Sequence, residues 1–234
     1  MLLYLVRHGD PIYVTDTLTE RGVLQAEAVG KRIARSKITD IYSSPMGRAR
    51  ETAAPAARLL GLECKIEDWS HEVEDERLTT YPDGKRKSVT LLQNTVLREN
   101  GNLYIPFEQT LECTGLSEAN MQPAIDRIVN GGRVFLARLG YKEENGIYRI
   151  TQPNEGKIAL FCHAVMQRVW ISHLLHIPLH LMWASFAPTH TGVTVIEFKN
   201  NADGFTAPKC LCFSDMSHLY AEELDMIHDN KFEI

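Results

Sequence analysis

The sequence lacks the features that mark membrane-spanning, exported and nucleic-acid-binding proteins. No apolar run approaches the length of about 18 residues that a transmembrane helix needs, and the apolar start at residues 1–6 is too short for a signal peptide. Positive charge is not in excess, because the formal net charge is -5. This balance argues against nucleic acid or an anionic membrane surface as the main partner. We therefore expect neither a membrane nor a nucleic-acid partner.

Cysteine is also scarce, and its pattern does not indicate a disulfide framework. The cysteines are odd in number and include no C-x-x-C pair. This favours reduced thiols and a cytoplasmic location. The five residues are Cys64, Cys113, Cys162, Cys210 and Cys212.

What the sequence does contain is typical of a globular domain with a sizeable core. Of its 234 residues, 44% are hydrophobic and 24% are charged. Short apolar runs alternate with amphipathic segments, which predicts an α/β fold of three layers, α/β/α, around a mostly parallel central sheet. Strands are expected at 1–6, 38–43, 157–162, 192–198 and 208–213, and helices at 18–36, 44–61, 117–139 and 164–176.

Several residues predict where the helices begin and end. Thr19 is the expected N-cap of the first helix. For the second helix we expect Ser44 as N-cap, Pro45 at the first position and Gly61 just past the end. Pro55 in its interior predicts a kink.

One segment interrupts the alternation. Residues 73–117 carry charges, prolines and glycines that break any long period, with a short helix expected near residues 88–100. We interpret the chain as a single domain, 1–234, with a cap-like insertion at about 73–117.

Polar residues follow the predicted strands at one edge of the sheet. His8 and His163 each come directly after a strand, and residues 44–48 follow another. In parallel sheets the ligand lies at the carboxyl ends of the strands. Arginines accompany the histidines here, and guanidinium groups bind phosphate oxygens through paired, charge-assisted hydrogen bonds. The predicted helix N-terminus at Pro45 would add backbone N–H donors. The site therefore suits an anion better than a metal ion, and an imidazole in it can attack phosphorus.

Four motifs occur together in this order: "LVRHG", "LTERGVLQA", "SSPMGRARETA" and a strand that ends in a second histidine. From residue 1 to about 198 this pattern resembles the histidine phosphatase superfamily, which has the phosphoglycerate-mutase-like fold. The resemblance implies that His8 is the nucleophile, Arg7 and Arg48 bind phosphate, and His163 is the second histidine. Arg50 falls on a variable position and is expected to be a surface or salt-bridge residue.

Two departures from the family pattern concern residues beside the histidines. Ala164 stands where the family usually has glycine, which predicts a tighter loop or a lower activity. Asp10 and Pro11 replace a polar residue and threonine after the first histidine, and the proline removes one N–H donor.

The departing alcohol needs a proton donor. The family's acid follows the second arginine at a spacing similar to that of Glu72, and the apolar neighbours Trp69 and Val73 would raise the pKa of this carboxyl. We prefer Glu72 for this reason. The other candidates in the same stretch are Glu67, Asp68, Glu74, Asp75 and Glu76.

The expected activity is hydrolysis of a phosphomonoester, a small phosphorylated metabolite, through a phosphohistidine intermediate. Only a short segment, "DPIYVTDT", separates the first motif from the first helix, which favours a phosphatase over a mutase. The basic turn at residues 81–88 could contact an anionic substrate tail or simply be solvated. We expect no cofactor or metal, because Arg7, Arg48 and a protonated His163 would meet the phosphoryl charge. The sequence does not indicate an oligomeric state.

Three alternatives remain open from the sequence. Cys162 and Arg168 form a C-x5-R pattern that resembles the phosphate loop of cysteine-dependent phosphatases. A catalytically weak phosphate- or partner-binding module of the same fold would be consistent with Ala164. A metal site is the third, and its ligands would be His173, His176 and His180.

Overall fold

The computed structural model describes residues 1–74, 78–80, 85–89, 105–112 and 119–228. A six-stranded sheet with the order β13-β11-β1-β10-β4-β5 forms its centre. Strand β1 is parallel to β10, β10 to β4 and β4 to β5, whereas β11 runs antiparallel to β1 and to β13. The strands are β1 (Leu2–Arg7), β4 (Asp40–Ser43), β5 (Cys64–Ile66), β10 (Lys157–Cys162), β11 (Val193–Glu197) and β13 (Lys209–Asp215).

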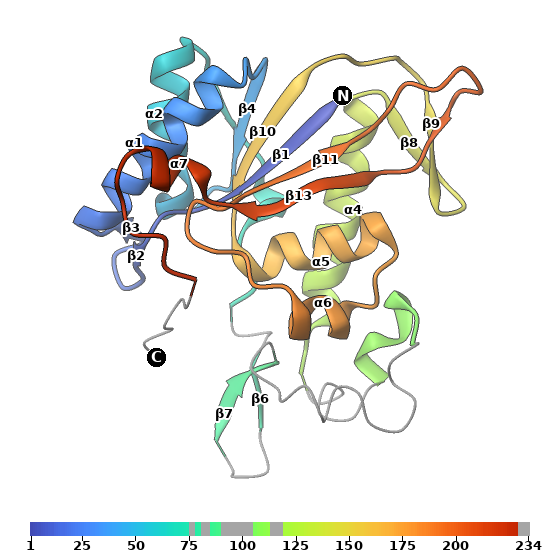
Figure 1. Ribbon diagram of the computed structural model, residues 1–234. Helices are drawn as coiled ribbons and strands as arrows, with labels where there is room; N and C mark the ends of the chain where they lie inside the picture. The colour runs from blue at the N-terminus through green and yellow to red at the C-terminus, as the bar shows by residue number, and fades with distance from the viewer. Residues whose placement is uncertain (75–77, 81–84, 90–104, 113–118, 229–234) are drawn as a thin grey trace.

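Helices cover both faces of this sheet (Figure 1). Side chains alternate along β1: Leu3 and Leu5 join an apolar cluster with α4 and α5, whereas Tyr4 and Val6 join a second cluster with α1 and α2. A strand buried on both faces is the reason why residues 1–6 are apolar throughout. The predicted three-layer α/β/α fold with a mostly parallel sheet is confirmed. The helices are α1 (Glu20–Arg35), α2 (Gly47–Leu60), α4 (Gln122–Arg138) and α5 (Ala164–Leu175).

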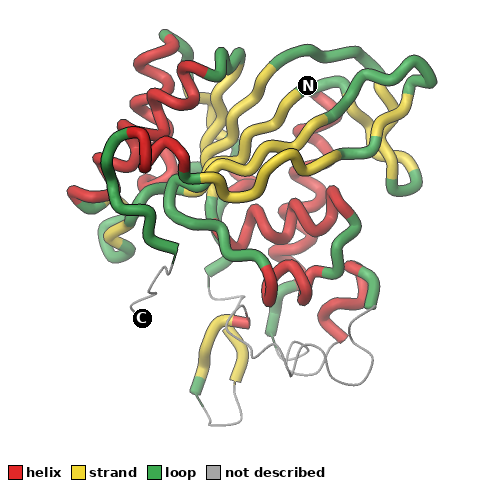
Figure 2. The backbone as a smooth tube through the Cα atoms, viewed as in Figure 1, coloured by secondary structure: helices red, strands yellow, loops and turns green. Residues whose placement is uncertain are grey.

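Smaller elements surround the three layers, as the colours of Figure 2 show. The sequence pattern gave no prediction for the strands between residues 141 and 150. The smaller strands form one three-stranded sheet of β8 (Tyr141–Glu144), β9 (Ile147–Ile150) and β12 (Phe205–Thr206), and two hairpins, β2 (Pro11–Ile12) with β3 (Thr17–Leu18) and β6 (Leu78–Thr80) with β7 (Arg86–Ser88). The short helical elements are the 3-10 turns η1 (Asp68–Ser70) and η5 (Phe107–Glu112) and the helices α6 (Leu179–Ser185) and α7 (Ser217–Ala221).

Two of the predicted helix boundaries are confirmed and one is wrong. The Thr19 hydroxyl accepts the Gly22 N–H at 3.0 Å, and Gly61 ends α2 with a φ of 65°. However, α2 begins at Gly47 rather than at Pro45. The hydroxyl of Ser44 accepts the Met46 N–H at 3.3 Å and lies 2.7 Å from His163 Nε2, so Ser44 forms a turn before the helix.

Pro55 does not interrupt α2, which is helical on both sides of it. A Cβ atom at Gly30 of α1 would lie 2.7 Å from the Pro55 Cβ. The proline ring therefore packs directly on the backbone of α1, and only glycine leaves room for this contact.

Helix α4 continues through the "NGG" sequence at residues 130–132. The two glycines are accounted for by packing, because the Trp69 and Trp170 side chains occupy the space that a side chain at 131 or 132 would need. A Cβ atom at Gly132 would lie 2.2 Å from Trp170 Nε1.

We expect Gly132→Ala to lower the free energy of unfolding by about 1–3 kcal/mol, since the rigid Trp170 ring must move. Urea unfolding measures the change, and Asn130→Ala, an exposed change two positions earlier, should alter it by less than about 0.5 kcal/mol. A gain in stability at position 132 would show that helix propensity outweighs the clash.

The described parts of residues 73–117 form the β6–β7 hairpin and η5. Ile105, Phe107 and Leu111 pack against the apolar cluster of α4 and α5. Residues 90–100 of the predicted short helix lie outside the described residues, as do residues 81–84 of the basic turn. The single domain with a cap-like insertion therefore stays a prediction.

None of the helices in the described ranges combines the length and the apolar composition needed to cross a bilayer. In the same ranges Cys64, Cys162, Cys210 and Cys212 are free thiols, and Cys113 lies outside them.

Candidate active site

His8 lies where β1 ends, with 2% of its surface exposed. Its backbone N–H donates to the Cys162 carbonyl at 3.0 Å, which fixes it beside the end of β10. Its Nδ1 atom lies 2.7 Å from the Gly9 carbonyl oxygen. Because a carbonyl only accepts, this contact places the proton on Nδ1 and leaves the lone pair on Nε2. The ring is thus held in the tautomer that a nucleophile requires.

Burial and nearby positive charge keep this ring neutral. Desolvation first, and then the charges of Arg7 and Arg48, hold the pKa of His8 well below its usual value. The imidazole is therefore unprotonated at neutral pH, with the Nε2 lone pair available.

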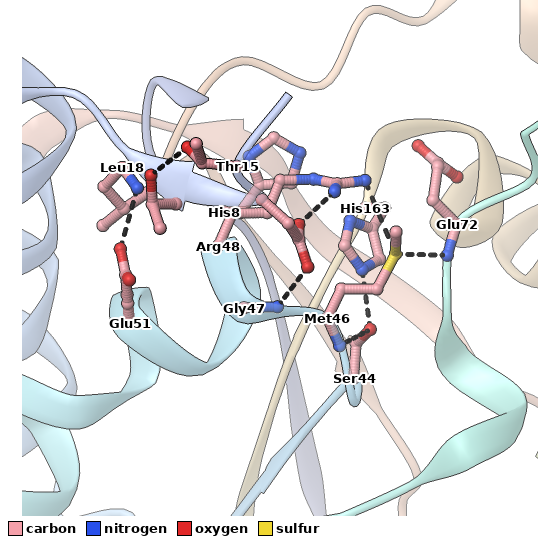
Figure 3. A network of polar contacts seen from close by, with 12 residues as sticks. His8, Thr15, Leu18, Ser44, Met46, Gly47, Arg48, Glu51, Glu72 and His163 are labelled. Atoms are coloured by element: carbon pink, nitrogen blue, oxygen red, sulfur yellow. Dashed lines mark hydrogen bonds and ion pairs between the residues drawn. The ribbon is translucent and has the colours of Figure 1, made fainter. Parts of the chain in front are cut away.

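His163 follows β10 and stands at the N-terminus of α5, and its ring centroid lies 5.2 Å from that of His8. Figure 3 shows it between Arg48 and Ser44. Its Nε2 lies 2.7 Å from the Ser44 hydroxyl, whereas its buried Nδ1 meets no hydrogen-bond partner in the described part of the chain. Such an atom costs free energy unless a ligand satisfies it. It therefore marks a position for a ligand oxygen.

His163 is neutral here, in place of the imidazolium expected from the sequence. Burial, followed by the charges of Arg48 and Arg7, lowers the pKa of His163 well below its usual value. The Ser44 oxygen already accepts the Met46 N–H, so its own hydrogen can point to Nε2 of His163. The Nδ1–H of a neutral ring is then free to donate to an anion.

Both arginines of the predicted set are buried beside the histidines. Arg7 is 1% exposed, and its Nη1 donates to the Pro188 carbonyl at 2.7 Å. Arg48, in the first turn of α2, is 3% exposed and forms an ion pair with Asp16, and its Nη2 lies 3.5 Å from the Met46 sulfur. Arg50, two positions further along α2, is exposed. Arg7 and Arg48 therefore lie beside the histidines and Arg50 does not, and their phosphate-binding roles stay predictions.

Asp16, which no pattern in the sequence indicates, occupies the N-terminus of α2. One carboxylate oxygen pairs with Arg48, and the other accepts the Gly47 N–H at 2.5 Å. The expectation that this helix N-terminus offers N–H donors to a bound anion is therefore wrong for Gly47, because the protein's own carboxylate fills that position. Asp16 lies in the turn of the β2–β3 hairpin, where no periodic pattern indicates its contact with α2.

Glu72 is buried and caps the N-terminus of α5. Its Oε1 accepts from the Val73 N–H at 3.0 Å and the Met166 N–H at 2.9 Å, and its Oε2 accepts from the Val165 N–H at 3.2 Å. It therefore lies directly beside the segment that carries His163.

The other candidate acids lie elsewhere or outside the described residues. Glu67 pairs with Arg138 and accepts from Trp69 Nε1 at 2.8 Å. Asp68 and Glu74 are exposed. The last two candidates, Asp75 and Glu76, lie outside the described residues.

The glycines of the first two motifs pack against each other's backbone. A Cβ atom at Gly9 would lie 2.8 Å from the Gly22 carbonyl oxygen, and one at Gly22 would lie 2.2 Å from the Asp10 oxygen. The glycines of "RHG" and "TERG" therefore allow the backbone of the loop after β1 to pack directly on the backbone at the start of α1.

Ala164 opens α5 and is buried without backbone strain, because it is not among the described non-glycine residues with positive φ. The departure from glycine therefore does not distort this loop.

A third histidine, His190, also borders His8, with its ring centroid at 5.7 Å. It lies in the loop before β11, and nothing in "APTHTG" distinguishes it from an ordinary turn residue in the sequence.

The cysteine alternative lacks the geometry it needs. Burial raises the pKa of the Cys162 thiol far above its usual value. The Arg168 side chain donates to the carbonyls of Ala164 at 3.1 Å and Trp183 at 3.2 Å. Cys162 and Arg168 therefore do not form the pair of thiolate and guanidinium that a cysteine-dependent phosphatase needs.

The metal alternative is also not supported. His173 Nε2 lies 3.0 Å from a Glu143 carboxylate oxygen, and His176 Nε2 lies 2.7 Å from the Gly146 carbonyl oxygen. Within the described ranges, which include His180, no group of three or more His, Cys, Asp and Glu side chains is placed to hold a metal ion.

Comparison with known proteins agrees with this fold and with the sequence motifs. The model of the histidine phosphatase superfamily (branch 1) matches residues 3–83. A probable phosphoglycerate mutase of Yersinia pestis (strain Pestoides F) is 38% identical over 69 residues, and the same holds for one of Yersinia pseudotuberculosis serotype O:1b. The match covers 26% of this chain and 32% of either relative, so the chain matches about a third of their length.

Solved structures extend the likeness of fold to nearly the whole chain. A phosphoserine phosphatase variant from Entamoeba histolytica, in complex with phosphoserine, has a TM-score of 0.62 at 20% identity and covers 93% of this chain and 98% of its own. A mycobacterial glucosyl-3-phosphoglycerate phosphatase, in complex with VO3, has a TM-score of 0.56 at 15% identity and covers 92% and 99%. The resemblance to the histidine phosphatase superfamily that the motifs indicate is confirmed.

Proposed function

We propose that this chain, similar to the histidine phosphatase superfamily in motifs and in fold, is a phosphomonoester hydrolase that works through a phosphohistidine at His8. The observation that carries the proposal is the 2.7 Å contact between Nδ1 of His8 and the Gly9 carbonyl oxygen. The Gly9 carbonyl holds the proton on Nδ1, and the neutral ring leaves Nε2 as a lone-pair donor among Arg7, Arg48 and His163.

In the first step Nε2 of His8 attacks phosphorus and forms a P–N bond, while the bond from phosphorus to the leaving oxygen breaks. Arg7 and Arg48 offset the charge of the phosphoryl oxygens, and the Nδ1–H of His163 donates to one of them. Glu72 gives a proton to the departing alkoxide, so that a neutral alcohol leaves.

In the second step water attacks phosphorus and the P–N bond breaks. The Glu72 carboxylate takes a proton from the water, which is the reverse of its first role. Inorganic phosphate leaves, and His8 returns to the neutral tautomer that its contact with Gly9 favours. The cycle consumes one ester and one water.

The proposed substrates are small phosphorylated metabolites. Structural neighbours from Entamoeba histolytica were solved with phosphoserine and with 3-phosphoglyceric acid, which supports this class without naming the compound. Hydrolysis is preferred to mutase activity because only the short β2–β3 hairpin separates the first motif from α1.

The second candidate is a phosphate- or partner-binding module with little activity. Its support in the sequence was Ala164, whose backbone is unstrained at the start of α5. Release of phosphate from a panel of phosphorylated metabolites and from p-nitrophenyl phosphate decides between the two. Phosphate binding without turnover of any panel member would favour the module.

Glu72→Gln should slow hydrolysis of alkyl phosphates far more than that of aryl phosphates. An alkoxide is a poor leaving group and needs the proton, whereas nitrophenolate departs without it. We expect a loss of about 100-fold or more in kcat for alkyl substrates and a loss of less than about tenfold for aryl substrates.

The matched control is Glu74→Gln, because Glu74 is the exposed acid two residues further along the chain. It should hydrolyse both substrate types at the rate of the unmodified protein. Thermal unfolding of each variant checks the cap of α5, because glutamine has one acceptor oxygen where Glu72 has two. Equal slowing of both substrate types by Glu72→Gln would remove Glu72 as the acid, and a selective loss in Glu74→Gln would move the role there.

A further inference from the structure

His190 lies in the loop between α6 and β11, on the same side of the sheet edge as His8. The two ring centroids are 5.7 Å apart, and the ring planes are tilted by 37°. His190 Nδ1 lies 3.4 Å from a carboxylate oxygen of Asp10. Its Nε2 is buried and makes no hydrogen bond with any residue that the structure describes. An imidazole nitrogen in this state next to the proposed nucleophile is available to a ligand.

The loop that carries His190 is attached firmly to the end of β1. The Thr191 N–H donates to the His8 carbonyl at 3.2 Å, and the Arg7 N–H donates to the Gly192 carbonyl at 3.2 Å. Thr191 has a φ of 56°, a conformation that a β-branched residue adopts only when its surroundings impose it. Its hydroxyl lies 3.0 Å from His218 Nε2, which supplies part of that constraint. The position of His190 is therefore fixed relative to His8.

Asp10 is itself held in place. One of its carboxylate oxygens accepts from the Thr19 hydroxyl at 2.8 Å, and its backbone N–H donates to Gln25 Oε1 at 2.8 Å. Its other carboxylate oxygen is the one that faces His190. This geometry favours a proton on Nδ1 of His190 and leaves Nε2 to meet a ligand.

Burial and the surrounding charged groups together set the protonation of His190. Arg7 from β1, Arg21 from α1, the neutral His8 and the Asp10 carboxylate face it. Burial first, and then the two arginines, lower the pKa of His190 to about 2, so the ring is neutral without a ligand. A phosphate dianion at His8 would bring two negative charges close to this ring and oppose the effect of the arginines.

We propose that His190 is a third phosphate-binding histidine, which takes up a proton when phosphate enters the site and donates Nε2–H to a phosphoryl oxygen while Asp10 holds Nδ1–H. The inference rests on the proposed function, because it assumes that phosphate occupies the pocket at His8. His190 would then add a charge-assisted hydrogen bond that does not exist in the ligand-free protein. Asp10 acts as a positioning residue through His190.

The test is calorimetric titration of the full chain with inorganic phosphate at pH 7, in buffers of different ionisation enthalpy. This measures both the Kd and the number of protons taken up on binding. We expect His190→Ala to weaken binding by about tenfold or more, the usual effect of losing a hydrogen bond to a charged group. His190→Gln keeps an N–H donor but cannot be protonated. It should therefore bind more tightly than His190→Ala and take up close to one proton fewer than the unmodified protein.

The matched control is His173→Gln. His173 is also a buried histidine beside a carboxylate, that of Glu143 at 3.0 Å, but it lies outside the site. This variant should keep the Kd and the proton uptake of the unmodified protein. If His190→Ala does not fold, as judged by circular dichroism, His190→Gln and Asp10→Asn decide. Asp10→Asn leaves the imidazole in place but should reduce the proton uptake, because the imidazolium loses its carboxylate partner.

The outcomes separate this inference from the proposed function. If the unmodified protein binds phosphate, Arg7→Ala abolishes binding and His190→Gln keeps both Kd and proton uptake, the role of His190 is wrong and the site stands. If the unmodified protein does not bind phosphate at all, the proposed function fails and the inference fails with it.

Discussion

Replacement of His8 by alanine is expected to abolish turnover, with a fall in kcat of at least about 10⁴-fold. The change removes the only nitrogen proposed to form the P–N bond. The fold should persist, because β1 and the Gly9–Gly22 contact do not depend on the imidazole. Steady-state hydrolysis of p-nitrophenyl phosphate measures the loss, and circular dichroism checks the fold.

His176→Ala is the control for this variant. His176 is an exposed histidine at the end of α5, and its replacement should leave the rate unchanged. Added imidazole offers a further check, because a small nucleophile can enter the space left by His8 and restore part of the activity to His8→Ala. A His8→Ala protein that retains more than a tenth of the original rate would contradict the nucleophilic role.

Arg48→Ala and Arg7→Ala should each lower kcat/KM by about 100-fold or more. Each guanidinium is almost fully buried at the site, so its charge acts on the phosphoryl group with little screening by water. Removing Arg48 also leaves the Asp16 carboxylate without its ion-pair partner, so that a negative charge then faces the phosphate. Kinetics on one aryl phosphate substrate measure both effects.

Arg50→Ala is the matched control, because Arg50 belongs to the same helix but is exposed. It should change kcat/KM by less than about threefold, as a surface charge does. Equal losses in the Arg48 and Arg50 variants would mean that the third motif has been aligned with the wrong arginine.

The sheet and its main helices could be predicted from sequence because their signals are local. Residues 1–6 are apolar throughout, Thr19 precedes an amphipathic run, and Gly61 follows one. The start of α2 could not be predicted in this way. Ser44 and Pro45 form a common helix-start pattern, but the Ser44 hydroxyl contacts His163, more than a hundred residues away in the chain. A tertiary contact thus overrides the local pattern.

The same distinction applies to the candidate site. Arg7, His8, Arg48 and His163 stand in recognisable motifs at the ends of strands, and the structure brings them together. Asp16 and His190 lie in a hairpin turn and a loop, and their contacts with Arg48 and His8 depend on how distant segments meet.

The prediction that His163 is protonated was wrong for a different reason. Its motif indicates a phosphate contact but not a protonation state, which depends on burial and on Arg48 and Arg7. The sequence identifies His163 as a candidate, but its protonation state depends on the residues that bury it in the folded protein.

The central claim is that the phosphoryl group passes through His8. The most direct test is to mix the full chain with substrate and quench within the first turnover under alkaline denaturing conditions that preserve phosphohistidine. Mass spectrometry of the digested protein then locates the added group. The account predicts one phosphoryl group, carried by the peptide that contains His8 and absent from His8→Ala. A phosphoryl group on Cys162, or turnover without any phosphorylated protein, would contradict it.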